Sequence, residues 1–414
     1  MVRVRIAPSP TGVPHIGNTR TALFNYLFAK HNNGKFIVRI EDTDRARFIK
    51  EAKSAIYEIL KWLGLKWDED YVQSERLAIY KEHAQILEKK GYLYEDNGAF
   101  RFKMPKKGET HWVDAIGNKK IVFQNKTQED FVAIKSDGYP TYNFANVVDD
   151  RLMTITHVIR GDEFISSTPK HIQIYKAFGW EQPVFAHLPV IVGSDRQKLS
   201  KRHGAKSVLD YKNEGFLKEA IINFMALLGW SPKGDKEILS MDEMTRLFDL
   251  KDVNTNSPIF NIEKLLWFNG YYIRQLSVSD LKSKLKSQKS KLQLKIQNLR
   301  DGLLDKLIEL GKTRMKTLND FEKLALHFFE EPKIKLDQNE QIIVKQLVEQ
   351  LSTIQQFNNS TILAKLKNVM VKNNIRMPVL YKILTGNESG LPLPESLEIL
   401  GKEKTLHRLK RLIQ

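Results

Sequence analysis

The amino-acid sequence predicts an α/β domain that carries a β-rich insertion and is followed by an all-α C-terminal half. Three observations support this fold class. Residues 2–41 have the order strand, loop, helix and strand, which is the size of one βαβ unit. Between residues 92 and 146 the apolar period is two, as in half-buried strands. Beyond Gly215 nearly all apolar residues recur at helical spacing.

The βαβ unit at the start of the chain is bounded by turn residues. In residues 2–6, valine and isoleucine alternate with arginine, and apolar residues at helical spacing run from Thr19 to Lys30. Asn32-Asn33-Gly34 ends that helix, and Phe36–Glu41 follows as a buried strand. Units of this kind stack into parallel sheets, so we expect such a sheet here.

The elements that follow alternate between helices and short strands. Amphipathic helices are expected at residues 52–63 and 77–87. The insertion is expected to contribute strands near residues 100–102, 121–123 and 131–134. A second α/β half is then expected from a helix at Thr168–Phe178 and an apolar strand at residues 185–192.

The C-terminal half is expected to be helical, with helices at residues 216–228 and 265–272 and several more up to Gln414. Within Leu281–Arg300, seven side chains are basic and none is acidic. This segment is predicted to be a lysine-rich helix.

The composition indicates a polyanionic partner. Lysine and arginine total 66 against 49 acidic residues, a net charge of +17 over 414 residues. With no basic amphipathic helix at either end, nucleic acid is favoured over an anionic membrane surface. The chain has no cysteine, which excludes disulfides, thiol nucleophiles and Cys-ligated zinc. No apolar run reaches the ~18 residues of a membrane span, and the N-terminus lacks a signal peptide, so we expect a cytosolic protein without a membrane partner.

A first candidate motif follows the first strand and opens the first helix. It is Ala7-Pro-Ser-Pro-Thr-Gly-Val-Pro-His15-Ile-Gly-Asn18. A helix N-terminus presents unpaired N–H groups and a positive dipole to a phosphate. Gly17 leaves room for a nucleotide base, and His15 can donate a hydrogen bond to a phosphate oxygen. Taken alone, such a turn often occurs by chance.

A second candidate motif is the basic loop Asp195-Arg-Gln-Lys-Leu-Ser-Lys-Arg-His-Gly204, after the strand expected to end near Val192. Nucleotidyl transfer needs cations near the leaving pyrophosphate, where negative charge grows in the transition state. Lys198 and Lys201 could supply them. Taken alone, a solvated basic loop is the better explanation of this segment in a chain of this charge.

Together the two motifs are more specific, because the carboxyl ends of strands are where open α/β sheets bind ligands. They resemble the HIGH and KMSKS signatures of class I aminoacyl-tRNA synthetases, here as His15-Ile-Gly-Asn18 and Lys198-Leu-Ser-Lys-Arg202. Further stretches narrow the resemblance to bacterial glutamyl-tRNA synthetases, and these are Arg5-Ile-Ala-Pro-Ser-Pro-Thr-Gly12, Phe36-Ile-Val-Arg-Ile-Glu-Asp-Thr-Asp-Arg45, Asp137-Gly-Tyr-Pro-Thr-Tyr-Asn-Phe-Ala-Asn-Val-Val-Asp149 and Val158-Ile-Arg-Gly-Asp-Glu163. The resemblance runs from Val2 to about Arg274 and continues more weakly to Lys410.

The resemblance implies a Rossmann-like catalytic domain that activates L-glutamate with ATP and Mg²⁺ and transfers it to the 3′-terminal adenosine of tRNA. In this family activation normally requires bound tRNA. The implied glutamate site consists of Arg5, Ser9, Glu41, Tyr142, Asn146 and Arg160. Glu41 would hold the ammonium group, and Arg5 and Arg160 would clamp carboxylates, which is the chemistry that glutamate needs.

The implied ATP site consists of His15, Gly17, Glu163, Lys198, Leu199 and Lys201. Of these, His15, Lys198 and Lys201 would be catalytic because they would bear the transferred negative charge. Arg45 and Arg47 would contact the acceptor end of tRNA. Arg314 would contact the anticodon, where an arginine accompanies strict selection of tRNA(Glu); charging of tRNA(Gln) as well stays open.

The chain departs from the family pattern in four places. The insertion is short and has no cysteine, so the zinc found in many members is not expected and no metal site is predicted. The first signature ends in Asn18, and the second ends in Arg202. The whole chain is shorter than typical members.

The resemblance also implies a division of the chain. The predicted parts are a catalytic domain at 1–76 and 142–200, a connective insertion for the acceptor end at 77–141, a stem-contact region at 201–276 and a helical anticodon-binding region at 277–414. A monomer is expected.

Three alternatives remain. A truncated paralogue that glutamylates a modified tRNA base lacks the helical C-terminal third. A glutaminyl-tRNA synthetase generally has a β-barrel anticodon module. A non-catalytic basic RNA-binding paralogue of the same fold would have no need for His15, Lys198 and Lys201.

Overall fold

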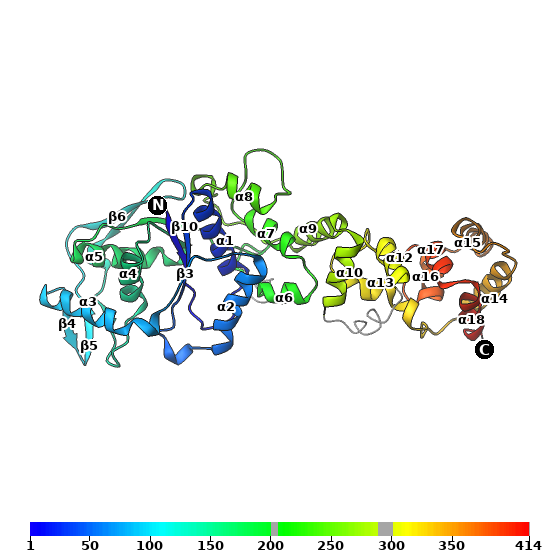
Figure 1. Ribbon diagram of the computed structural model, residues 1–414, viewed down its shortest axis with the longest axis horizontal. Helices are drawn as coiled ribbons and strands as arrows, with labels where there is room; N and C mark the ends of the chain where they lie inside the picture. The colour runs from blue at the N-terminus through cyan, green and yellow to red at the C-terminus, as the bar shows by residue number, and fades with distance from the viewer. Residues whose placement is uncertain (200–205, 289–300, 414) are drawn as a thin grey trace. The chain divides into compact units, whose positions relative to one another are not determined.

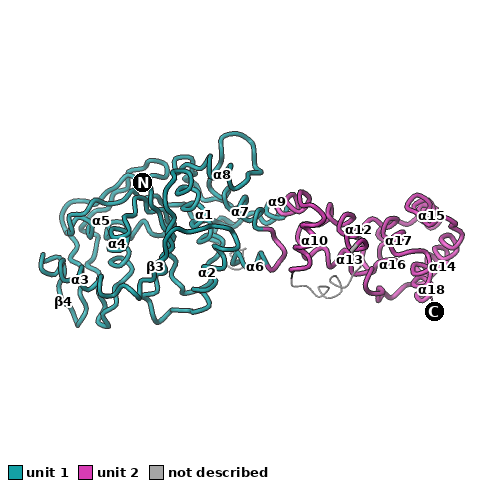
Figure 2. The backbone as a smooth tube through the Cα atoms, viewed as in Figure 1, with its two compact units in different colours: residues 1–212, 218–268 teal, residues 213–217, 269–414 magenta. Residues whose placement is uncertain are grey.

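The computed structural model describes residues 1–199, 206–288 and 301–413. The chain divides into two compact units, of which unit 1 comprises residues 1–212 and 218–268, and unit 2 comprises residues 213–217 and 269–414 (Figure 2). Each unit has its own apolar core.

Unit 1 is built on parallel strands, as the sequence predicts (Figure 1). Strands β1 (Arg3–Ile6), β2 (Lys35–Ile40) and β3 (Glu69–Val72) pair in that order and in parallel. Strands β9 (His157–Gly161) and β10 (Val184–Leu188) form a second parallel pair. The backbone N–H of Thr156, next to β9, donates to the carbonyl of Arg3 at 2.9 Å and joins this pair to the three-stranded sheet. The βαβ prediction is confirmed, whereas β3 was not predicted because its sequence, Glu-Asp-Tyr-Val, is short and polar.

Helices α1 (Ile16–His31), α2 (Lys50–Leu63), α3 (Leu77–Lys89) and α5 (Thr168–Phe178) confirm four predicted helices. Helix α1 begins three residues before the predicted start. The prediction of a strand-like period up to residue 146 is wrong for its last residues, because helix α4 (Tyr142–Leu152) already begins at Tyr142. Its buried Phe144, Val147 and Val148 lie at helical spacing, and this signal is stronger than the alternation that precedes it.

The β-rich insertion forms two antiparallel sheets. Strands β4 (Leu93–Asp96), β5 (Ala99–Phe102) and β8 (Phe131–Ile134) form one sheet. Strands β6 (Glu109–Asp114) and β7 (Lys119–Gln124) form a hairpin. Ala115, directly after β6, donates its backbone N–H to the carbonyl of Phe185 in β10 at 2.9 Å, so this hairpin is joined to the parallel strands.

The remaining helices follow the predicted pattern. Strand β10 ends four residues before Val192, and the helices after it are α6 (Val208–Asn213), α7 (Lys218–Ala226), α8 (Met241–Leu247) and α9 (Ile262–Gln275). Short 3₁₀ turns lie at Arg45–Arg47, Gln73–Arg76, Asn125–Thr127, Asp162–Ser167 and Leu250–Asp252.

The described part of unit 2 contains helices and no strand, as predicted. The helices are α10 (Val278–Ser287), α12 (Asp301–Gly311), α13 (Asp320–Phe329), α14 (Gln338–Ser352), α15 (Asn359–Asn373), α16 (Met377–Thr385), α17 (Leu393–Leu400) and α18 (Lys402–Arg411). The predicted lysine-rich helix is confirmed up to Ser287, and residues 289–300 lie outside the described part. Among all described helices, none is long and apolar enough to cross a membrane.

Candidate active site

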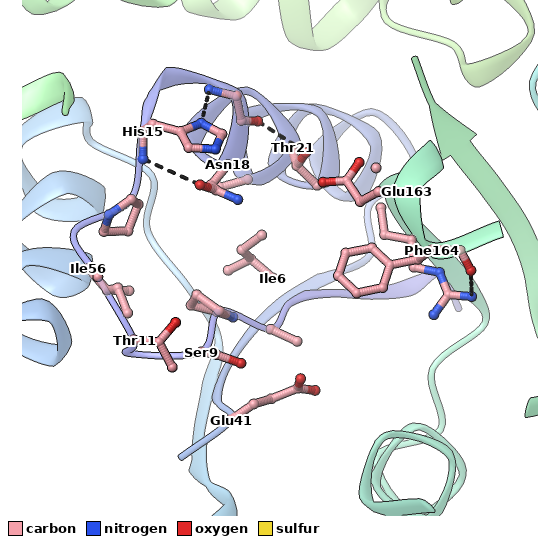
Figure 3. Close-up of a pocket in the computed structure, with 18 of the residues that line it drawn as sticks. Ile6, Ser9, Thr11, His15, Asn18, Thr21, Glu41, Ile56, Glu163 and Phe164 are labelled. Carbon is pink, nitrogen blue, oxygen red and sulfur yellow. Dashed lines mark hydrogen bonds between the residues drawn. The ribbon is translucent and has the colours of Figure 1, made fainter. Parts of the chain in front are cut away.

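A cavity of about 890 Å³ opens at the carboxyl ends of β1, β2 and β9 and at the N-terminus of α1 (Figure 3). This edge of a parallel sheet is the usual ligand site of such folds. Twelve of the residues predicted from the sequence line it, namely Arg5, Ser9, His15, Gly17, Glu41, Arg47, Tyr142, Asn146, Arg160, Glu163, Lys198 and Leu199. The cavity therefore brings both candidate motifs to one place.

His15 is the residue that caps helix α1. Its Nδ1 accepts the backbone N–H of Gly17 at 3.0 Å, and Asn18 Oδ1 accepts the backbone N–H of His15 at 3.3 Å. Because Nδ1 is an acceptor, the ring proton of neutral His15 is on Nε2. Burial lowers the pKa of His15, although Glu163 opposes this shift, so the neutral form is favoured. A Cβ at position 17 would lie 2.9 Å from His15 Cε1, which explains the glycine.

The second motif starts in a tight hairpin. Leu199 donates its N–H to the carbonyl of Ile191 at 3.0 Å, and Gly193 donates to the carbonyl of Gln197 at 2.9 Å. The exposed Lys198 lies with its Nζ 4.0 Å from Glu163 Oε1. The Glu163 carboxylate lies over Gly161, where a Cβ would clash with Oε2. Lys201 and Arg202 lie outside the described residues.

One side of the cavity rests on a buried network in which every arginine meets a carboxylate. Arg5, 3% exposed, donates from Nε to Asp150 Oδ1 at 3.0 Å and from Nη2 to Oδ2 at 3.4 Å. Arg39, 0% exposed, donates to Asp150 Oδ1 at 2.7 Å and to Glu41 Oε1 at 2.9 Å. We call these residues, together with Asp149, the acid-paired side.

The carboxylates of the acid-paired side are held unequally. Burial alone would raise the pKa of Asp150, but Arg5 and Arg39 outweigh it and lower the pKa. Burial raises the pKa of Glu41 even though Arg39 opposes it. Asn146 Nδ2 donates to Glu41 Oε1 at 2.9 Å, and no described residue donates to Oε2. The Oε2 atom of Glu41 is therefore available to a ligand.

Another side of the cavity contains an arginine that meets only neutral acceptors. Arg160 is 5% exposed and donates from Nε to His187 Nε2 at 3.2 Å. Its Nη1 faces the Tyr142 hydroxyl at 3.0 Å and His171 Nδ1 at 3.3 Å. Its Nη2 donates to the Phe164 carbonyl at 3.3 Å and to Thr168 Oγ1 at 2.8 Å. We call Arg160, Tyr142, His171 and His187 the neutral side.

The two histidines of the neutral side act as acceptors. Burial lowers the pKa of His187, although Asp114 opposes this shift, and burial lowers the pKa of His171 well below its ordinary value. The five N–H bonds of Arg160 are all used, and no carboxylate among the described residues lies within 4.0 Å of its guanidinium. Among the described residues, its positive charge therefore has no carboxylate in direct contact with it.

The remaining predicted residues lie away from this centre. Arg47 is exposed at the cavity rim and donates from Nε to Asp44 at 2.7 Å. Arg45 lies outside the cavity lining and stacks on the Tyr139 ring at 5.4 Å. Arg314 belongs to unit 2, where its Nη1 donates to the Gly390 carbonyl at 2.7 Å.

Sequence reasoning missed Arg39, Asp149, Asp150, His171, His187 and Asp114. One signal was present for three of them, because Arg39 and the pair Asp149–Asp150 are charged residues inside otherwise apolar elements. The histidines carried no such signal. No group of three or more His, Asp or Glu side chains arranged to bind a metal ion occurs within the ranges that the structure describes.

The parallel sheet, the histidine-capped helix and the lysine hairpin meeting at one cavity define a class I aminoacyl-tRNA synthetase. Comparison with known protein families supports this assignment. The family described as class I tRNA synthetases (E and Q), catalytic domain, matches residues 1–100 and 95–267. The anticodon binding domain family matches residues 278–413.

Relatives that align over the whole of this chain identify one family within this class. Glutamate–tRNA ligases of Dehalococcoides mccartyi and Thermodesulfovibrio yellowstonii are 38% and 40% identical, over 100% of this chain and 98% and 99% of theirs. A crystal structure of a glutamate tRNA ligase from Elizabethkingia meningosepticum in complex with its amino acid is 33% identical, with a TM-score of 0.84 over 100% of this chain and 99% of that chain. The chain belongs to the glutamate–tRNA ligase family. The relatives support this reading and not the non-catalytic alternative, and their match over the helical C-terminal region does not fit the truncated paralogue.

Proposed function

We propose that the chain joins L-glutamate to tRNA in two steps, using ATP supplied with Mg²⁺ as the substrate complex. A carboxylate oxygen of glutamate attacks the α-phosphate, a new O–P bond forms, and pyrophosphate leaves. The 2′-hydroxyl of the terminal adenosine then attacks the mixed anhydride, and AMP leaves. The protein contributes mainly positioning and charge stabilisation.

The observation that carries this proposal is that one cavity contains Arg160, which has no contacting carboxylate among the described residues, and Glu41, whose Oε2 accepts no described hydrogen bond. A buried cation without a counter-ion is costly, and a substrate carboxylate would remove that cost. Glu41 Oε2 supplies the complementary acceptor for an ammonium group. An amino acid with a second carboxylate fits both ends, helped by Arg5, Ser9, Tyr142 and Asn146, which line the same cavity.

The hydrogen bonds of Arg160 modify the role expected for it. Since its N–H groups already have partners, Arg160 acts through its charge and through the Tyr142 hydroxyl. That hydroxyl accepts from Arg160, so its own proton is free to be donated to the substrate. Arg5 keeps Nη1 for direct contact, because its described bonds use Nε and Nη2.

We place ATP at the other end of the cavity, against the N-terminus of α1. His15 Nε2 donates to a phosphate oxygen, and Gly17, Glu163 and Leu199 line the nucleotide subsite. Lys198 stabilises the pyrophosphate as it leaves, and we assign the same role to Lys201.

We further propose the division of the chain expected from the sequence, with residues 277–414 reading the anticodon and residues 77–141 holding the acceptor end. Arg45 and Arg47 then contact the acceptor strand, and Arg314 contributes to selection of tRNA(Glu) over tRNA(Gln). The enzyme acts as a monomer in the cytosol, where its substrates occur. Charging assays with the two purified tRNAs test the selection, and retained charging of tRNA(Gln) would contradict it.

Glutamate-dependent exchange of pyrophosphate into ATP, measured with and without tRNA(Glu), tests the proposal. We expect exchange with glutamate when tRNA is present, and slower exchange by about 10²–10³ in Lys198→Ala, the usual effect of losing one donor to developing negative charge. Arg246→Ala is a matched control, because it removes a cation from helix α8, outside the cavity lining. Absence of glutamate-dependent exchange in the wild-type protein with tRNA(Glu) present would overturn the proposal.

A further inference from the structure

Strand β6 of the insertion places a buried carboxylate next to the amino-acid pocket. Asp114, 3% exposed, lies at the end of β6 and accepts the backbone N–H of His187 at 3.1 Å and of Ile116 at 3.1 Å. Its Oδ2 also faces His187 Nδ1 at 2.5 Å and Trp112 Nε1 at 3.2 Å. The carboxylate is surrounded by donors and is held in one orientation.

This contact decides which nitrogen of His187 carries the proton. An ionised carboxylate can only accept, so Nδ1 donates to Asp114 and neutral His187 keeps a lone pair on Nε2. That lone pair accepts Nε–H of Arg160. The other tautomer would direct an N–H at the N–H of Arg160, and an imidazolium would place a second cation beside it.

The orientation of Arg160 in turn fixes Tyr142. With Nε taken by His187 and Nη2 by Thr168, Arg160 directs Nη1 at the Tyr142 oxygen. The hydroxyl is then an acceptor toward Arg160 and a donor toward the cavity. A carboxylate suits this donor and the adjacent positive charge, whereas a carboxamide leaves the charge uncompensated.

We propose that Asp114 and His187 are positioning residues that commit Arg160 and Tyr142 to binding a substrate carboxylate, so that the insertion determines selection of glutamate over glutamine. This inference rests on the proposed function. It assigns to the insertion a task in amino-acid selection, in addition to the contact with tRNA proposed above.

Two substitutions at one position separate positioning from space filling. His187→Phe preserves a ring that can stack on Phe185 but offers no acceptor to Arg160. His187→Gln removes the ring but can place an amide oxygen near the position of Nε2. A positioning role predicts that His187→Gln is the better enzyme, and a packing role predicts the reverse.

The readouts are KM for glutamate, KM for ATP and the ratio of glutamate to glutamine activation, all with tRNA(Glu) present. We expect His187→Phe and Asp114→Asn to raise KM for glutamate and to lower the ratio by about tenfold to a hundredfold, the effect of one hydrogen bond to a charged group. KM for ATP stays within about twofold, and His187→Gln recovers most of the loss.

Thr110→Val is the matched control. Thr110 is buried on the same strand and bonds to Asn125 and Gln173, and none of its described hydrogen bonds goes to His187 or Arg160. We expect wild-type KM values and selection for it. Equal effects of Thr110→Val and Asp114→Asn, or better activity and selection in His187→Phe than in His187→Gln, would overturn the inference. Absence of wild-type glutamate activation would instead overturn the proposed function.

Discussion

The two sides of the cavity differ in the partners of their buried arginines. On the acid-paired side, Arg5 and Arg39 share the carboxylates of Asp150 and Glu41. On the neutral side, Arg160 receives only lone pairs from histidines, hydroxyls and a carbonyl. We expect an arginine that is paired with carboxylates to belong to the scaffold, and one without a contacting carboxylate to bind an anionic ligand. The difference predicts that the first kind controls stability and the second controls activity.

The largest expected effect is on stability, from Arg39→Met. The change leaves Glu41, Asp149 and Asp150 buried with one cation fewer, and breaking such a pair costs about 3–5 kcal/mol. All six tryptophans lie between residues 62 and 267, in unit 1. Denaturant unfolding followed by tryptophan fluorescence therefore measures this unit selectively. A loss below about 1 kcal/mol, the scale of an ordinary neutral hydrogen bond, would contradict the scaffold role.

Arg160→Met should lower activity more than it lowers stability. We expect kcat/KM for glutamate to fall about a hundredfold, because the carboxylate loses its counter-charge. The free energy of unfolding should fall by less than in Arg39→Met, since removal of an uncompensated buried cation offsets part of the lost hydrogen bonding. The same unfolding experiment, combined with pyrophosphate exchange, compares the two variants. Equal stability losses in both would remove the distinction between the sides.

Acid should affect the two sides at different pH. The pKa of His171 is lowered in the folded chain. Below about pH 6.5 the unfolded chain therefore binds a proton that the folded chain does not, and the free energy of unfolding decreases as the pH is lowered. The folded pKa of Asp150 is also lowered, so its stabilising contribution is complete above about pH 4 and is lost only below it.

Replacing His171 isolates the first contribution. His171→Asn can keep an acceptor near Nδ1 without a titrating ring. We expect the slope of unfolding free energy between about pH 6.5 and pH 5 to decrease by up to about 1.4 kcal/mol per pH unit relative to wild type. An unchanged slope would mean that this histidine titrates normally.

The smallest effect is expected at the edge of the acid-paired side. Arg76, partly exposed, donates to Asp149 at 2.9 Å, but Tyr80 and Gln73 also donate to that carboxylate. Arg76→Gln should therefore cost only about 1 kcal/mol in unit 1 and leave kcat/KM unchanged. A loss as large as that of Arg39→Met would show that the network depends on its rim.

The sequence allowed prediction of many residues that line the cavity but not of the residues that hold them in place. His15 and Lys198 stand in local motifs, and the helix that His15 caps has its own periodicity. Arg39 and Asp150 are 111 residues apart, and Asp114 and His187 are 73 apart. Such pairs arise only when strands from different parts of the chain meet. Strand β3 was missed for a related reason, since its pairing with β2 gives it its structure and its own residues do not.

The attachment of β6 to the parallel strands limits how the enzyme can be recombined. Insertions of different length are often treated as exchangeable modules, and the alignment with one relative spans 473 positions against 414 residues here. Yet Asp114 and Ala115 both bond to β10, so a transplant that replaces β6 also replaces the hydrogen bonds that this hairpin makes to β10. Chimeras joined outside residues 109–124 should keep amino-acid selectivity, and joints inside this hairpin should alter it. We therefore expect the hairpin β6–β7 to be transferable only together with β10, unlike the rest of the insertion.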